Sequence, residues 1–285
     1  MAKDTFLNRK LTLNCKGRLV DLSRPQVMAI INLTPDSFYG GSRVNVKDEL
    51  LLKVENFIKE GAAFIDLGAY SSRPGALNIS VQEETDRLLP AVEEINRQFP
   101  HALISIDTFR ADVAEKAIHA GANIINDIAA GNLDDQMFAT VAKLGVPYIM
   151  MHMKGTPQNM QQNPVYNNLT EEVLNYFLEK VGILKKLGVK DIIIDPGFGF
   201  AKTLEHNYEL LKQMEVLSVL ELPILVGVSR KSMICKLLNI KPGEALNGTS
   251  VLNTVALLKG ADILRVHDVK EAVECVELIG SMNKV

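Results

Sequence analysis

Short apolar runs that stop at a polar residue recur along the chain and alternate with segments of helical periodicity. The first run covers residues 27–31, ends at Asn32 and is followed by a turn-prone loop, 34–37. An apolar run of this length between turn signals is typical of a strand buried on both faces. We expect eight such strands, at 27–32, 63–68, 103–108, 123–128, 147–152, 191–195, 223–229 and 263–267.

Segments between these runs carry apolar residues at helical spacing, as Val54, Phe57 and Ile58 do within 48–60. The other predicted helices are 81–97, 111–120, 134–144, 170–187, 204–214, 244–259 and 269–282. Several end at a glycine, the residue that helix C-caps favour. Eight alternations without a break in composition predict an α/β fold, a (β/α)8 TIM barrel at 27–282 in a single domain, 1–285. An open doubly wound sheet is the structural alternative.

A second, smaller element is predicted ahead of the barrel. Two strand-like runs flank Lys16-Gly17, a plausible hairpin turn, so we expect an N-terminal β-hairpin over residues 11–22.

Composition and charge exclude several classes of protein. Apolar residues make up 47% and charged residues 23% of the 285 residues, which predicts a substantial core. The formal charge of −3 gives no general attraction to nucleic acid or to an anionic membrane. Three widely spaced cysteines without a Cys-x-x-Cys pair indicate reduced thiols. With no signal-peptide core and no membrane-spanning run, we expect a soluble, cytoplasmic protein.

Polar side chains at the strand ends are the candidate site. In a barrel, alternate strand residues point inward, and chemistry collects where the strands end. By this period of two, one set of residues is expected to converge on a pocket: Asn32, Asp107, Asn126, Asp195, Lys231, Arg265 and His267. Gly227 shares the inward phase, and its missing side chain would leave room for a ligand.

Each of these residues also has a structural explanation. A single Asp often caps a helix, a single His often packs in a core, Lys231 is also consistent with a solvated loop, and Arg265 with pairing to Asp262 or Asp268. Burying all of them without partners would cost ~1–3 kcal/mol each. We therefore expect a functional site rather than seven coincidences.

The residue types indicate a ligand class. Carboxylates at Asp107 and Asp195, with the Asn126 amide, suit a flat heterocycle that carries donors and acceptors. Arg265 and His267 suit an anion, and an Asn oxygen such as that of Asn32 is a hard ligand of the kind Mg²⁺ takes beside phosphate oxygens. The set predicts a nitrogen heterocycle that carries phosphate.

The loops extend this prediction to a family. Their motifs, in chain order, are 32–38, 71–75, 105–108, 126–128, 151–157, 195–202, 227–232 and 265–268. Together they closely resemble the dihydropteroate synthase family, folate-pathway transferases that are sulfonamide targets. The resemblance runs from about residue 27 to residue 268, and the ordered set is far more specific than any one motif.

The resemblance implies a role for each matching residue. Asp107, Lys231, Arg265 and His267 would be catalytic. The pterin pocket would consist of Asp107, Asn126, Met151, Asp195, Gly227 and Lys231, with Arg265 against the ring face. Asn32, Arg265 and His267 would hold pyrophosphate, with Mg²⁺ at Asn32. The p-aminobenzoate site would consist of Ser72, Arg73, Pro74, Phe200, Lys231 and Ser232.

The implied reaction condenses 6-hydroxymethyl-7,8-dihydropterin pyrophosphate with p-aminobenzoate, giving 7,8-dihydropteroate and pyrophosphate. Pyrophosphate would leave first, and the amine would attack a pterin-methylene cation. The resemblance also implies competition by sulfonamides and a homodimer formed through the late helices.

The chain departs from the family pattern in its first two loops. Gly40 stands where the first loop usually has Asp, and Tyr70 and Ser72 stand where the second usually has Glu and Thr. Two alternatives remain open on the residues alone. A methyltetrahydrofolate-type methyltransferase would share the aspartates and Asn126 but would not need the Arg73 or Lys231 loops. A non-catalytic pterin-binding barrel predicts erosion at Lys231, Arg73 or His267, which are all present.

Overall fold

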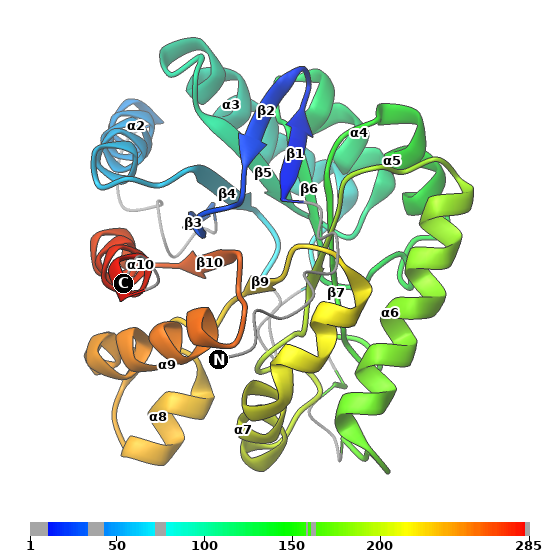
Figure 1. Cartoon of the computed structure of the whole chain (residues 1–285). Coiled ribbons are helices and arrows are strands. Elements are labelled where there is room, and N and C mark those ends of the chain that lie inside the picture. Colours follow the sequence, from blue (N-terminus) through cyan, green and yellow to red (C-terminus); the bar gives the residue numbers. More distant parts are fainter. Residues whose placement is uncertain (1–10, 34–42, 72–77, 158, 161–163, 283–285) are drawn as a thin grey trace.

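Strands and helices alternate along the chain in a computed structural model that describes residues 11–33, 43–71, 78–157, 159–160 and 164–282 (Figure 1). The strands are β1 (Thr12–Cys15), β2 (Arg18–Asp21), β3 (Gln26–Asn32), β4 (Phe64–Gly68), β5 (Leu103–Asp107), β6 (Ile124–Asp127), β7 (Tyr148–Met151), β8 (Ile192–Asp195), β9 (Leu225–Val226) and β10 (Ile263–Val266). The α-helices are α2 (Arg43–Lys59), α3 (Val81–Gln98), α4 (Ala111–His119), α5 (Met137–Leu144), α6 (Leu169–Lys186), α7 (Leu204–Gln213), α8 (Ser232–Leu238), α9 (Leu246–Leu258) and α10 (Val269–Met282). Two 3₁₀ helices, η1 (Met214–Leu220) and η2 (Pro242–Glu244), complete the set.

The eight strands from β3 to β10 form one parallel sheet, which closes into a barrel. Their order is β8-β7-β6-β5-β4-β3-β10-β9, and a parallel bridge between Ile194 and Ile224 joins the two ends. The helices lie outside the strands (Figure 1). The predicted TIM barrel is therefore confirmed, and the open-sheet alternative is wrong.

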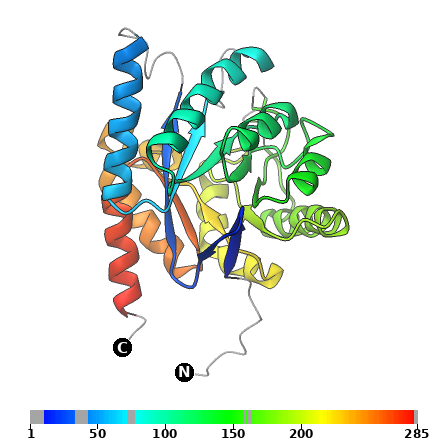
Figure 2. The same cartoon turned by 90° about the horizontal axis from the view of Figure 1, so that it is seen from above.

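The N-terminal hairpin is also confirmed. β1 and β2 pair antiparallel around Lys16 and Gly17, whose φ angles are 52° and 88°. Two successive positive φ angles are typical of the turn that matches the twist of a hairpin, and glycine adopts the second without strain. The buried side chains of Leu13, Cys15 and Leu22 pack against the inward-facing residues of the barrel. The hairpin thereby closes the end of the barrel from which the strands start, and Figure 2 shows it at that end.

Alternation along the strands divides the core into two layers. Inward-facing apolar residues form a cluster inside the barrel, namely Met28, Phe64, Leu103, Ile124, Ile149, Ile193, Leu225 and Ile263. Outward-facing residues such as Ala29, Ile65 and Ile104 pack against the helices in a larger cluster. On five of the eight strands the next inward residue, two positions further along, is polar: Asp66, Ser105, Asn126, Asp195 and Arg265. These polar groups therefore lie towards the end of the barrel opposite the hairpin.

Several boundaries differ from prediction. The seventh barrel strand, β9, covers only Leu225–Val226 and not the predicted 223–229. The chain leaves the strand at Gly227 and turns at Ser229. Helix α8 was not predicted, since its seven residues are too few to show a clear helical period.

No helix in the described part of the chain is both long and apolar enough to cross a membrane.

Candidate active site

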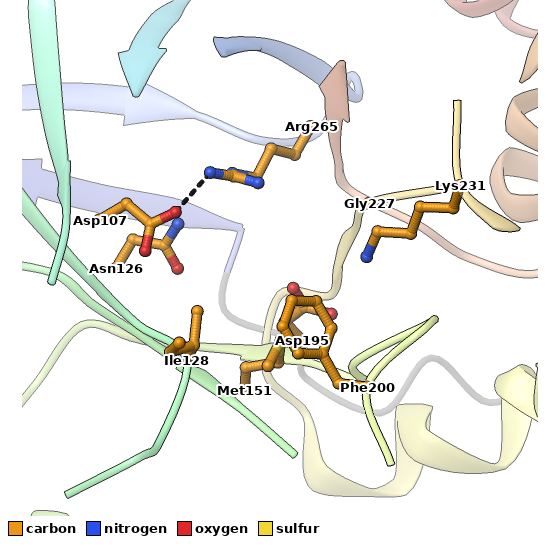
Figure 3. Close-up of a pocket in the computed structure, with 9 residues that line it drawn as sticks. All are labelled: Asp107, Asn126, Ile128, Met151, Asp195, Phe200, Gly227, Lys231 and Arg265. Carbon is orange, nitrogen blue, oxygen red and sulfur yellow. Dashed lines mark hydrogen bonds and ion pairs between the residues drawn. The ribbon is translucent and has the colours of Figure 1, made fainter. Parts of the chain in front are cut away.

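The pocket at the carboxyl ends of the strands brings together most of the predicted residues (Figure 3). Its lining is Asp107, Asn126, Ile128, Met151, Asp195, Phe200, Gly227, Lys231 and Arg265. Eight of these nine were predicted, and Ile128 was missed. Asn32 ends β3, and His267 directly follows the neighbouring strand β10, but neither residue lines this pocket. Ser232 begins α8 and is exposed. The predicted Ser72, Arg73 and Pro74 and the predicted Gly40 loop lie outside the described residues.

Arg265 crosses the barrel mouth to two carboxylates. Its Nε donates to Oδ2 of Asp66 at 2.6 Å, and its Nη2 donates to Oδ2 of Asp107, also at 2.6 Å. Arg265 does not form the alternative ion pair with Asp262 or Asp268. Asp268 binds Arg230 instead, and Asp262 accepts from the backbone N–H of Ile224. The guanidinium is thereby held flat across the end of β4 and β5.

Asp66 is a second residue that the sequence analysis missed. It is fully buried on β4, and the Nδ2 of Asn126 donates to its Oδ2 at 3.2 Å as well. Asp66 therefore orients both Arg265 and the Asn126 amide. The same period of two that placed Asp107 inward also places Phe64, Asp66 and Gly68 inward, so the signal was present in the sequence.

The carboxyl of Asp107 lies close to both a cation, Arg265, and a second carboxylate, Asp66. Burial raises the pKa of its carboxyl to about 7, opposed by the Arg265 guanidinium and reinforced by the charge of Asp66. A carboxyl with a pKa near neutrality can both accept and donate a hydrogen bond. Helix α4 has Arg110 at its N-cap position, so Asp107 does not serve as a cap.

Asp195 and Lys231 form the other side of the pocket. Asp195 is buried at the end of β8, and its Oδ1 accepts from the backbone N–H of Gly197 at 2.7 Å. Burial raises the pKa of this carboxyl, and the Lys231 ammonium partly offsets the shift. Lys231 donates to the carbonyl of Phe198 and lies 4.8 Å from the centre of the Phe200 ring. Burial lowers the pKa of Lys231 to about 8.

Gly227 lines the pocket near Lys231 and Arg265. A Cβ at this position would lie 3.7 Å from the Nζ of Lys231 and 3.9 Å from the Cβ of Arg265. These are ordinary contacts for a methyl group, but a larger side chain would extend into the pocket. The missing side chain therefore leaves space between the two cations.

The loop after β8 is fixed by a buried lysine. The Nζ of Lys202 contacts the Nδ1 of His152 at 3.0 Å and donates to the carbonyls of Gly197 and Phe200 at 3.0 and 3.1 Å. Burial lowers the pKa of Lys202 to about 7. These contacts hold Phe200 against the pocket, so the structure gives Lys202 a supporting role that the motif alone did not reveal.

His267 and Ser229 meet beside the pocket. The Oγ of Ser229 lies 3.0 Å from the Nδ1 of His267 and accepts the backbone N–H of His267 at 3.2 Å. Burial lowers the pKa of His267 to about 4, and the cations Arg265 and Arg230 lower it further. The imidazole is therefore neutral at pH 7.

Two residues of the motif loops make their contacts within the protein and do not line the pocket. Tyr70 packs edge-on against Phe109 at 5.0 Å and lies under the Arg110 guanidinium, 5.5 Å away. Asp127 accepts from the hydroxyl of Tyr148 and from the backbone of Ala129, so it shapes its own loop rather than the pocket.

The donor set fits Mg²⁺ bound jointly with a phosphate ligand. Among the described residues, no group of three or more His, Cys, Asp and Glu side chains could hold a metal. Asn32 offers one neutral oxygen at the end of β3. Mg²⁺ commonly takes one or two protein oxygens together with phosphate oxygens and water.

Comparison with known proteins agrees with this chemistry. The family profile described as "Pterin binding enzyme" matches residues 28–267. The chain is 42% identical to dihydropteroate synthase of Escherichia coli K12 over 271 residues, which cover 94% of this chain and 95% of that protein. It is 39% identical to dihydropteroate synthase of Bacillus subtilis over 258 residues, which cover 90% of this chain and 88% of that protein.

Two solved structures have the same fold. The Yersinia pestis dihydropteroate synthase in complex with a sulfonamide drug has a TM-score of 0.90 at 41% identity, covering 96% of this chain and 100% of its own. The Xanthomonas albilineans enzyme with 4-aminobenzoic acid has a TM-score of 0.88 at 34% identity, covering 96% and 99%. With identity of this extent and a matching family profile, the chain belongs to the dihydropteroate synthases, pterin-binding transferases of folate biosynthesis.

Proposed function

We propose that the pocket condenses 6-hydroxymethyl-7,8-dihydropterin pyrophosphate with p-aminobenzoate in an SN1-like reaction. The observation that carries the proposal is the pairing, in one pocket, of Asp107, Asn126 and Asp195 with Arg265 and Lys231. Acidic and amide groups can bind the ring nitrogens and amino group of a pterin, while the cations attract its pyrophosphate.

The pterin ring is proposed to lie across the barrel mouth. Asp107 and Asn126 on one side and Asp195 on the other offer acceptors at the edge of a flat ring. Met151 and Ile128 supply apolar contact, and Gly227 leaves room beside Lys231. Arg265, held by its two carboxylates, presents the face of its guanidinium to the ring.

The pyrophosphate is proposed to bind at the carboxyl ends of the neighbouring strands β3 and β10. Asn32, Arg265 and His267 supply an amide, a guanidinium and a neutral imidazole at this edge. Asn32 would hold Mg²⁺ as its protein ligand, and the ion would supply positive charge beside the pyrophosphate. The family membership and the donor set support this assignment.

The p-aminobenzoate is proposed to bind beside Phe200, Lys231 and Ser232, covered by the loop that contains Ser72, Arg73 and Pro74. The related enzyme of Xanthomonas albilineans has been solved with 4-aminobenzoic acid, and that of Yersinia pestis with a sulfonamide drug. We therefore expect sulfonamides to compete with p-aminobenzoate in this protein.

Catalysis is proposed to depend on electrostatics rather than on a nucleophile. Among the described residues that line the pocket, none carries a hydroxyl or a thiol. Arg265 and His267 stabilise the charge that grows on pyrophosphate as the C–O bond breaks, and Asp195 and Asp107 stabilise the pterin-methylene cation. The amine of p-aminobenzoate then attacks the methylene carbon and loses a proton. We propose that Lys231, next to both ligand sites, positions the two reactants.

We also propose a homodimer in the cytoplasm. Helices α9 and α10 lie against one another and expose Val251, Leu258, Leu278 and Met282 by 54–69%. Large exposed apolar side chains on adjacent helices are typical of a surface that another subunit covers. The three cysteines are free thiols, as a reducing cytoplasm maintains them.

The deciding experiment follows both products. Purified protein with pterin pyrophosphate, Mg²⁺ and p-aminobenzoate should release pyrophosphate and form dihydropteroate in equal amounts. Pteroate formation no greater than in a protein-free control would overturn the proposed reaction, and release of pyrophosphate alone would overturn the transfer step.

A further inference from the structure

Ser229 and His267 make two hydrogen bonds at the rim of the site. Ser229 follows β9 and is only 4% exposed, and His267 follows β10. The backbone N–H of His267 donates to the Oγ of Ser229 at 3.2 Å, and the same Oγ lies 3.0 Å from the Nδ1 of the imidazole. The serine thus touches both the backbone and the ring of one residue.

The direction of the second bond follows from the valence of the hydroxyl. A serine hydroxyl has one proton to donate and two lone pairs to accept with. One lone pair is occupied by the backbone N–H of His267. Within the described parts of the chain, the O–H has no other hydrogen-bond acceptor than Nδ1. If the second lone pair accepted from Nδ1–H instead, the buried hydroxyl proton would have no partner among the described residues, which is unfavourable. Donation from the O–H to Nδ1 satisfies both groups, and a neutral imidazole then carries its proton on Nε2.

We propose that Ser229 is a positioning residue that holds His267 in the Nε2–H tautomer, so that a neutral imidazole donates a hydrogen bond to the departing pyrophosphate. This inference rests on the proposed function, because that function places the anion at His267. It specifies the tautomer of His267, which the assignment of His267 to pyrophosphate binding leaves open.

The tautomer matters because the imidazole is neutral. Burial and the neighbouring guanidinium groups of Arg265 and Arg230 keep its pKa near 4. A neutral ring presents either an N–H or a lone pair to its ligand. The Nδ1–H tautomer would direct the lone pair of Nε2 at a phosphate oxygen and repel it, whereas the Nε2–H tautomer donates.

The turn that carries Ser229 is itself fixed. Arg230 has a φ of 56°, a left-handed conformation that costs a non-glycine residue about 1–2 kcal/mol. Its backbone N–H donates to the Oγ1 of Thr249 at 3.1 Å, and its Nε donates to Oδ2 of Asp268 at 2.9 Å. Ser229 and Arg230 thus bind His267 and Asp268 in consecutive order. The turn directs Ser229 to β10 and sends Lys231 back into the pocket.

Nitrogen NMR of the full-length protein, labelled with ¹⁵N-histidine and free of ligand, tests the tautomer directly. Long-range proton–nitrogen spectra distinguish Nε2–H from Nδ1–H, and the spectrum of His267→Gln identifies the signals of His267. We expect a single Nε2–H tautomer in the wild type, retained in Ser229→Thr and replaced by a mixture in Ser229→Ala. An Nδ1–H or charged ring in the wild type, or an unchanged pure tautomer in Ser229→Ala, would overturn the proposal.

Pyrophosphate binding in the presence of Mg²⁺ tests the consequence. Ser229→Ala should weaken binding about tenfold, the effect of losing about 1.4 kcal/mol, and Ser229→Thr should restore it. His267→Gln keeps an amide N–H near the position of Nε2 but has no tautomers. In that background Ser229→Ala should cause no further loss, whereas an equal loss in both backgrounds would mean that Ser229 only supports the loop and would overturn the proposal.

The tautomer of His267 and the proposed reaction are tested by separate measurements. Wild-type turnover tests the proposed reaction, and the NMR spectrum of the free protein does not depend on it. A wild type that shows the Nε2–H tautomer but forms no pteroate would overturn the reaction and support the tautomer. An active wild type with an Nδ1–H ring would do the opposite.

Discussion

Arg265 and Asp66 form an ion pair at 2.6 Å across the barrel mouth, although 199 positions separate them in the chain. Asp66 is fully buried and also accepts from Asn126. One buried carboxylate therefore orients a cation and an amide of the proposed pterin site. Asp66 does not itself line the pocket, so we expect it to position the groups that do.

Asp66→Asn should destabilise the protein and weaken substrate binding. Loss of the charge leaves Arg265 buried with a single carboxylate partner, and breaking a buried pair costs about 3–5 kcal/mol. We expect a fall of this size in the free energy of unfolding in urea, with a higher KM for pterin pyrophosphate. Asp112→Asn is the matched control, since Asp112 pairs with Lys116 on the exposed surface of α4. An exposed pair contributes at most about 1 kcal/mol, so equal losses in both variants would contradict the role of Asp66.

Lys231→Ala should reduce kcat/KM by about 10²–10³ while leaving the fold intact. Its ammonium lies between Asp195 and Phe200 in the pocket, where it can reach both proposed ligands. Steady-state kinetics together with a thermal melt would measure the effect. Lys236→Ala, on the exposed surface of helix α8, which begins directly after Lys231, serves as control. Activity near the wild-type value in Lys231→Ala would remove this residue from the site.

The pH profile of kcat/KM should be bell-shaped. Below a pH of about 7, Asp107 is protonated and loses the charge that favours the pterin cation, so activity should rise as pH increases through this value. Above about 8, Lys231 loses its proton, so activity should fall. Lys231→Arg keeps its charge at alkaline pH and should move the alkaline limb upward. An alkaline limb that stays in place in this variant would assign the limb to another group.

Gly227→Val should exclude the pterin without unfolding the barrel. A Cβ fits at 3.7 Å from the Nζ of Lys231, but the two methyl groups beyond it would occupy the pocket. We expect KM for pterin pyrophosphate to rise by about tenfold or more, a loss of ~1.4 kcal/mol or more. Gly227→Ala should have a much smaller effect, and Gly243→Val, where a Cβ meets no atom within 4 Å, should have almost none. Comparable KM values in all three variants would contradict the steric argument.

Leu278→Lys should convert the proposed dimer to a monomer. Leu278 is 69% exposed on α10, beside α9, and a charge there cannot be buried against a second subunit without a large desolvation cost. Sedimentation velocity would measure the change in mass. Leu178→Lys, on α6 and 52% exposed, is the control that should leave the oligomer unchanged. A wild-type monomer in this experiment would refute the dimer itself.

Much of the architecture could be predicted from local patterns. The period of two identified Asp107, Asn126, Asp195 and Arg265 as inward-facing strand-end residues, because a β-strand alternates its side chains whatever its neighbours are. The same rule applied to the strand 63–68 predicts an inward Asp66, but its importance depends on a partner 199 positions away. Short elements were less predictable, and α8, with seven residues, shows no period of its own.

Alternation, chain length and turn residues were sufficient to predict the barrel, the hairpin and the strand ends at which polar side chains gather. The partner of each polar side chain depends on how the strands are arranged in space. Arg265 could have paired with its neighbours Asp262 or Asp268, but these bind Ile224 and Arg230 instead. Likewise, the hydroxyl of Ser229 meets Nδ1 of His267 only because β9 and β10 lie side by side. Hydrogen bonds depend on distances in space, which local periodicity cannot specify.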